Sequence, residues 1–123
     1  MTLIVDFEQV DDPEMDISTS RIEDGRFLMD GWIDSGGVGV RFPQRGKHRV
    51  KLTATRVESF SFTDEAGTGT LIPETVEVEE HRVRITGVIP ATLTLATEGR
   101  SDVRFEIEES PFAVRRRFKW IAV

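Results

Sequence analysis

The chain has 123 residues, 38% of them hydrophobic and 31% charged, a size and composition that suit one folded domain rather than a disordered segment. The absence of cysteine excludes disulfides, thiolate metal sites and a cysteine nucleophile. A formal charge of −6 disfavours binding to nucleic acid or to an anionic membrane.

The expected compartment follows from composition and hydropathy. The opening residues, MTLIVDFEQVDD, contain a short apolar run without a basic leader, so no signal peptide is expected. No stretch approaches the roughly 18–20 consecutive apolar residues that span a bilayer. We therefore expect a cytoplasmic protein with one domain over residues 1–123, and neither nucleic acid nor membrane as a partner.

Apolar and polar residues alternate along the first half of the chain. Val50 and Leu52, for example, alternate with Arg49 and Lys51. One apolar and one polar face on a short run is typical of an antiparallel strand. The same period occurs in the segments LIVDFEQV, MDISTSRI, GRFLMDGWID, GGVGVRF, HRVKLTATR and SFSFT.

The second half continues the alternation, with one change of phase. Apolar residues stand at even positions in Val76 and Val78 but at odd positions in Val83 and Ile85. Such a slip requires either a turn around residues 79–81 or a β-bulge. We favour the turn.

These runs predict an all-β fold. The five prolines fall between the apolar runs, and no window shows the period of an amphipathic helix. About nine or ten short strands in one domain must split into two sheets or curl, because a flat sheet leaves one face uncovered. We expect a single-domain antiparallel β-sandwich or flattened β-barrel with little or no helix.

The last residues, SPFAVRRRFKWIAV, combine cations with aromatic rings. A nucleic-acid platform would need both on one exposed face. Alternation instead places Phe118 and Trp120 on the face opposite Arg115. In a hairpin with the preceding strand, Glu106 would face Arg115 and neutralise it. We favour this final strand over nucleic-acid binding, with Arg116 as a cation on the apolar face and therefore a candidate for a buried ion pair.

Carboxylates gather in the segment VDFEQVDDPEMD, and they include Asp11, Asp12 and Glu14. Clustered oxygens suit a hard cation, but this spacing lacks the glycine turn of an EF-hand loop. We therefore expect a solvated acidic edge and no metal site. Asp11, Asp12 and Glu14 are candidate contacts for another protein.

No other motif points to catalysis or to a cofactor. His48 and His81 stand in no metal-ligand or triad spacing, and we expect both on the surface. The glycines of SGGVGV lead into a run typical of a strand, whereas a phosphate-binding loop leads into a helix. We assign no catalytic residue, no cofactor and no metal.

One strand carries large apolar side chains on both faces. In GRFLMDGWID, Leu28 and Trp32 lie on the face opposite Phe27, Met29 and Ile33. Either both faces are buried within the protein, or Leu28 and Trp32 form an exposed anchor for a partner, since tryptophan is enriched at binding hot spots.

Three functions stay open, and none follows from a motif. The first is a non-catalytic protein-interaction module of the accessory, inhibitor or immunity type. It would meet another protein or a second copy of itself through Leu28 and Trp32 or through the acidic loop. The second is a β-barrel that binds a small molecule or lipid. The third is an enzyme with carboxylates on separate strands. We favour the first.

Overall fold

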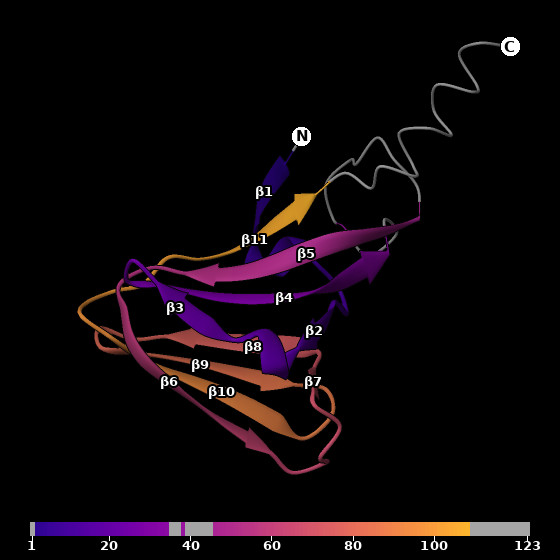
Figure 1. Ribbon diagram of the computed structural model, residues 1–123. Coiled ribbons are helices and arrows are strands. Elements are labelled where there is room, and N and C mark those ends of the chain that lie inside the picture. The colour runs from indigo at the N-terminus through magenta and orange to yellow at the C-terminus, as the bar shows by residue number, and fades with distance from the viewer. Residues whose placement is uncertain (1, 35–37, 39–45, 109–123) are drawn as a thin grey trace, which may run out of the picture.

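The computed structural model describes residues 2–34, 38 and 46–108, which form eleven strands and two short 3₁₀ helices (Figure 1). The strands of the larger sheet are β1 (Thr2–Asp6), β2 (Glu14–Asp16), β3 (Arg21–Glu23), β4 (Arg26–Asp34), β5 (Lys47–Ala54), β7 (Thr70–Leu71) and β11 (Val103–Glu108). Those of the smaller sheet are β6 (Val57–Asp64), β8 (Pro73–Val78), β9 (Arg82–Gly87) and β10 (Ala91–Thr97). The 3₁₀ helices are η1 (Phe7–Gln9) and η2 (Ile17–Thr19).

The strands form two antiparallel sheets, one above the other in Figure 1. The larger sheet has the order β1-β11-β5-β4-β2-β7, with β3 also paired to β4, and the smaller has the order β6-β10-β9-β8. Over the described residues, neither sheet closes into a barrel. The prediction of an all-β fold with little helix is confirmed. Of the two expected architectures, the structure has the sandwich.

The core lies between the two sheets, where alternate residues of each strand point inward. Val50 and Leu52 of β5 are at most 2% exposed, and Leu95 of β10 in the facing sheet is fully buried. Phe105 of β11 stacks on Phe7 of η1 with the ring centres 5.4 Å apart. Period-two alternation therefore identified the inward face correctly along these strands.

His48 corrects one expectation from the sequence. The sequence analysis places it on the surface, but it is fully buried. On β5 it has the same parity as Val50 and lies opposite Ile33 of β4, so it points into the core. Lys47, by contrast, is exposed. His81 is exposed, as expected.

The run MDISTSRI is not the single strand that its alternation predicts. Met15 is paired with Gly31 of β4, and Arg21 is paired with Leu28 of the same strand. Between these two pairs, the segment has five residues (16–20) where β4 has only two (29 and 30). The extra length forms η2, which separates β2 from β3.

Two connections show how local sequence sets the turns. Asp24 and Gly25 join β3 to β4 with φ values of 50° and 75°. This is the backbone of a type I′ hairpin turn, for which Asp-Gly is a preferred sequence. Between β8 and β9, the backbone N–H of Glu79 donates to the carbonyl of Arg82 at 2.8 Å. The change of apolar phase is therefore a turn, as predicted.

β11 lies between β1 and β5, and this position corrects the hairpin expected at the C-terminus. Glu106 is paired with Ile4 on one side and with Lys51 on the other. Both edges of β11 are thus occupied, so Glu106 has no ladder position left for Arg115.

Two further predictions fall outside the described part of the chain. The candidate ion pair of Arg116 belongs to residues 109–123. The glycine-rich segment SGGVGV falls in residues 35–40, of which only Val38 is described, in an antiparallel bridge with Val10.

Candidate functional site

A groove of about 350 Å³ crosses the outer face of the larger sheet. β4, β5 and β11 supply its floor, and η2 with the residues beside it supplies one wall. Seven of its eleven lining residues are charged, so the groove is better suited to binding a polar surface of another molecule than to binding an apolar ligand. These seven are Asp16, Arg21, Asp30, Arg49, Lys51, Glu106 and Glu108.

Residues of opposite charge lie beside one another across the floor of the groove. Asp30 on β4 is paired with Lys51 on β5, and Lys51 is paired with Glu106 on β11. Cross-strand pairs of opposite charge contribute about 0.2–1 kcal/mol each and favour one register. With four carboxylates and three cations, the groove has a formal charge of −1.

Trp32 stands at the wall of the groove. It is 48% exposed and has the largest side chain among the exposed hydrophobic residues that the structure describes. Arg49, directly opposite on β5, holds its guanidinium carbon 5.6 Å from the centre of the indole ring. A cation at this distance is attracted to the π face, so the contact positions the ring while leaving much of it in solvent.

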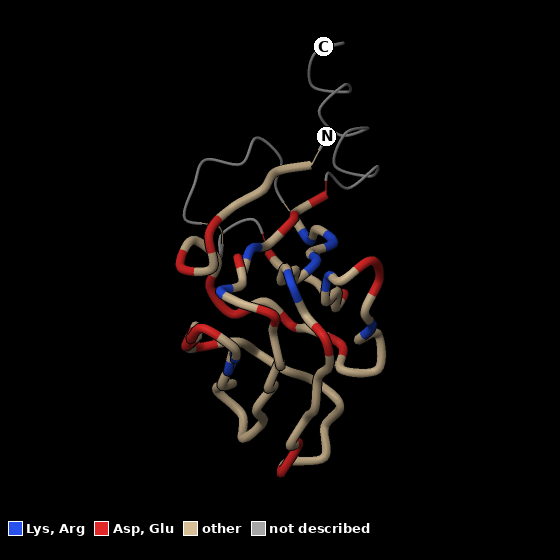
Figure 2. The backbone as a smooth tube through the Cα atoms, turned by 90° about the vertical axis from the view of Figure 1, so that its left-hand side faces the viewer, with Lys and Arg blue, Asp and Glu red and all other residues tan. Residues whose placement is uncertain are grey.

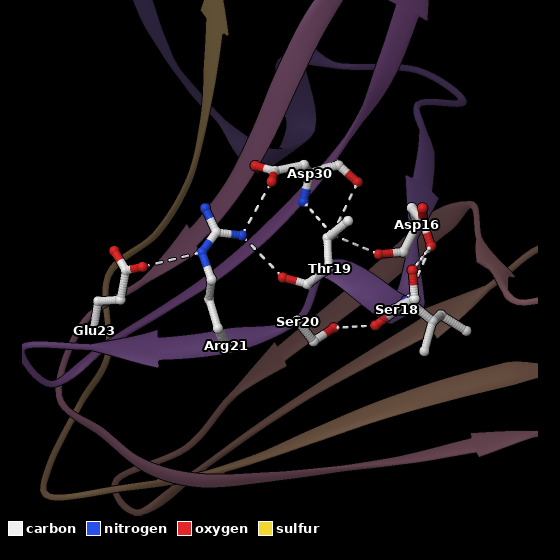
Figure 3. A network of polar contacts seen from close by, with 8 residues as sticks. Asp16, Ser18, Thr19, Ser20, Arg21, Glu23 and Asp30 are labelled. Carbon is white, nitrogen blue, oxygen red and sulfur yellow. Dashed lines mark hydrogen bonds and ion pairs between the residues drawn. The ribbon is translucent and has the colours of Figure 1, made fainter.

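Thr19 of η2 joins the wall of the groove to β4 (Figure 3). Its hydroxyl accepts the backbone N–H of Asp30 at 2.8 Å and donates to the carbonyl of Asp16 at 2.7 Å. The side chain therefore supplies the hydrogen bond that a neighbouring strand would otherwise give where η2 interrupts the ladder.

Arg21 holds the carboxylate of Asp30 in place (Figure 3). Its guanidinium donates to Oδ2 of Asp30 at 3.0 Å, to the carbonyl of Thr19 at 2.9 Å and to Oε1 of Glu23 at 3.2 Å. Burial lowers the pKa of Arg21, but the hydrogen bonds and charges of Asp30 and Glu23 outweigh this effect and leave the pKa raised. Arg21 is therefore a permanent cation that fixes the wall to the floor.

The structure brings several of the predicted contact residues together. Glu14 of β2 lies directly opposite Trp32. Asp12, Asp34, Ile33 and Lys47 join these two residues around a small pocket of about 50 Å³ beside the groove. Asp11 is exposed in the same loop but does not line this pocket. Three carboxylates, Asp12, Glu14 and Asp34, and one cation, Lys47, thus form a rim of net negative charge next to an exposed aromatic ring.

Leu28 does not share the exposure of Trp32. It is only 6% exposed, although it lies on the same outer face of β4. There it is paired with Arg21 on β3 and with Thr53 on β5. Of the two alternatives drawn from the sequence, Leu28 follows the buried one and Trp32 the exposed one.

Sequence reasoning did not single out Arg49, Thr19 or Asp30 as parts of a site. For Arg49 a signal existed, because its parity on β5 matches that of Lys51 on the solvent face. The bond between Thr19 and Asp30 had no comparable signal, because it depends on η2 and on the pairing of two strands with β4.

Two features are absent within residues 2–34, 38 and 46–108. No three His, Asp or Glu side chains gather there as a metal site, and no helix there is both long and apolar enough to cross a bilayer. No known family model matches this chain, and neither a characterised protein nor a solved structure is significantly similar to it. The function must therefore be argued from the site itself.

The chain is acidic, with 22 Asp and Glu residues against 16 Lys and Arg residues and a formal charge of −6. Acidic positions follow the trace through both sheets in Figure 2. Among the described residues, six Lys and Arg residues lie on strands of the larger sheet, namely Arg21, Arg26, Lys47, Arg49, Lys51 and Arg104.

Proposed function

We propose that this protein is a non-catalytic binding module whose partner is a protein with a basic surface. The partner covers Trp32 and the groove beside it. The observation that carries this proposal is the half-exposed Trp32, held against the centre of the larger sheet by Arg49. Tryptophan and arginine are the residues most enriched at hot spots, where a ring of polar groups surrounds them.

Charge supports a basic partner rather than an acidic one. Asp12, Glu14 and Asp34 are exposed around Trp32 and outnumber the nearby cations Lys47 and Arg49, and the chain carries a formal charge of −6. Complementary charge steers association and rejects partners of the wrong sign. Because salt screens exposed charges, binding should weaken as ionic strength rises.

The two other candidate functions have less support. A carrier of an apolar molecule would need an apolar pocket, but most residues that line the groove are charged. An enzyme that uses carboxylates on separate strands as acid and base would need two of them with different proton affinities. In the groove, Asp30 is in an ion pair with Arg21 at 3.0 Å, and Glu106 is in one with Arg26 at 3.8 Å. Ion pairs of this kind indicate that these carboxylates hold neighbouring segments together.

Tryptophan fluorescence gives a direct test of the site. The chain has two tryptophans, so Trp120→Phe leaves Trp32 as the only emitter. A protein captured from lysate of the source cell is purified and titrated into this variant. We expect the emission of Trp32 to shift to shorter wavelength, because the ring loses contact with water.

Matched variants decide whether the groove is the contact surface. Trp32→Ala should weaken the affinity about 30-fold or more, which corresponds to about 2 kcal/mol. Val88→Ala removes a side chain that is 54% exposed between β9 and β10, and it should leave the affinity unchanged. Asp12→Asn combined with Glu14→Gln should weaken binding at low salt only. An unchanged affinity in Trp32→Ala would overturn the proposal.

A further inference from the structure

β6 is an edge strand whose centre lacks the usual protection. Within the described residues its only ladder is with β10, and one further backbone hydrogen bond at its start joins the N–H of Val57 to the carbonyl of Gly25 in the turn between β3 and β4. It is eight residues long. Its central run Ser59–Thr63, SFSFT, lies between Glu58 and Asp64 and itself contains no charge, proline or glycine. Natural edge strands are normally shielded by charges, prolines, bulges or short length.

The opposite edge of the same sheet shows such protection. β8 begins at Pro73 and carries Glu74 and Glu77, both exposed. A second strand that approached β8 would meet these carboxylates. A strand that approached the centre of β6 would meet hydroxyl groups and phenyl rings instead.

The unprotected edge also borders the core. Phe60 and Phe62 are paired with Leu95 and Leu93 of β10, so they point between the two sheets. Phe60 contacts the buried Phe27 edge to face with the ring centres 5.2 Å apart, yet it remains 37% exposed. The ring of Phe62 is 6.3 Å from that of Phe60. An added strand with apolar residues at alternate positions would cover both rings.

We propose that a second copy of this chain supplies that strand, with β6 pairing to β6 about a two-fold axis normal to the sheet. β6 itself alternates phenylalanine with serine and threonine, so it is the amphipathic strand that the edge requires. A two-fold contact of this kind is closed and uses the same surface on both copies. The two smaller sheets then merge into one continuous sheet, and the four phenyl rings adjoin.

Symmetry limits the register of this pairing. Residues directly opposite on antiparallel strands share a face of the sheet, so paired positions must both be odd or both be even. A centre at Ser61 places Phe60 opposite Phe62 of the other copy and Ser59 opposite Thr63. At each end it also places Glu58 opposite Asp64, a pair of like charges that salt screens. A centre at Phe60 would instead place Phe62 opposite Glu58, where a bulge interrupts the pairing with β10, and a centre at Phe62 would place Phe60 opposite Asp64. The register that places each phenyl ring opposite another is therefore centred on Ser61.

Self-association through β6 is independent of the groove on the outer face of the larger sheet. The two copies carry charges of the same sign, so salt should strengthen their association. Salt should weaken the binding of a basic partner at Trp32. The two proposals can therefore fail separately, and the sign of the salt effect tells them apart.

Cysteine cross-linking tests the register in the full chain, which has no cysteine of its own. Residues directly opposite on antiparallel strands have Cα atoms about 4.5–5.5 Å apart, within the range of roughly 4.4–6.8 Å that a disulfide bridges. Ser61→Cys should form a disulfide-linked dimer on oxidation with copper phenanthroline, many times faster than Thr75→Cys, an exposed position on β8. A mixture of Ser59→Cys and Thr63→Cys should give the mixed dimer in preference to either symmetric dimer.

Sedimentation velocity gives an independent readout without cysteines. The dimer fraction of the unmodified chain should rise with protein and salt concentration. Ser61→Lys adds a charge at an exposed edge position and should leave a monomer, whereas Thr75→Lys should behave as the unmodified chain. Equal melting temperatures would show that both variants fold. The proposal fails if the unmodified chain is monomeric throughout, if the dimer survives Ser61→Lys, or if Ser61→Cys and Thr75→Cys cross-link equally.

Discussion

Trp32 on β4 and Arg49 on β5 lie directly opposite each other, with the guanidinium carbon 5.6 Å from the centre of the indole ring. The pair requires both strands, because cross-strand neighbours on one face meet only when the ladder has set its register. It keeps a flat aromatic surface at the end of a groove whose floor is charged. This pair is the anchor of the proposed binding surface.

The contact between Arg49 and Trp32 should be measurable as a coupling energy. Arg49→Gln should lower the free energy of unfolding by about 0.5–1 kcal/mol, because it removes the cation from the ring. In a Trp32→Leu background, the same substitution should have a much smaller effect. Urea denaturation of the four proteins measures the difference. Equal effects in both backgrounds would mean that the two side chains do not interact.

Substitutions at Leu28 and Trp32 should show which of the two side chains the fold needs for its stability. Leu28→Ala should lower the free energy of unfolding by about 2–5 kcal/mol, because it empties a site that is only 6% exposed. Trp32→Ala should cost clearly less, since about half of its ring already contacts water. Urea denaturation compares the two variants. A larger loss for Trp32→Ala would show that the ring is a structural element.

The hydroxyl group of Thr19 should contribute to the stability of the fold. Thr19→Val keeps the shape of the side chain but leaves the N–H of Asp30 and the carbonyl of Asp16 without this partner. We expect the free energy of unfolding to fall by about 1–3 kcal/mol. Ser18→Ala is the control, because that hydroxyl bonds only the exposed Asp16 carboxylate among the described contacts. Amide hydrogen exchange at Asp30 should be faster in Thr19→Val but not in Ser18→Ala. This difference would show that the loss of stability arises at the hydrogen bond between Thr19 and Asp30.

Gly31 should tolerate no side chain. A Cβ atom there would lie 2.2 Å from the carbonyl oxygen of Glu14 and 2.8 Å from the Cα of Met15, both backbone atoms of β2. Gly31→Ala must therefore displace β2, and we expect a loss above about 3 kcal/mol, at or beyond the upper end for overpacking. Gly25→Ala meets no atom within 4 Å and should cost only about 1–2 kcal/mol, from its φ of 75°. Similar thermal stabilities for the two variants would contradict this account of β2.

The inward or outward direction of many side chains could be predicted from the sequence alone. Side chains alternate along a strand whatever its neighbours are, so Phe27 and Met29 had to face away from Trp32. The same rule places His48 in the core beside Val50. The expectation of a surface position for His48 was therefore wrong, because it did not use this parity. The Asp-Gly turn between β3 and β4 was likewise encoded locally, since φ above zero favours this pair.

Only the tertiary structure decided which strands are neighbours. Glu106 could face any cation of suitable parity, and the structure gives it Lys51 because β11 lies between β1 and β5. The wall of the groove has the same origin, since Thr19 reaches Asp30 only where η2 interrupts the strand beside β4. Alternation along the chain fixes the face on which a side chain lies. Which other strand pairs with it depends on long-range contacts that the whole fold satisfies together, and no single segment contains that information.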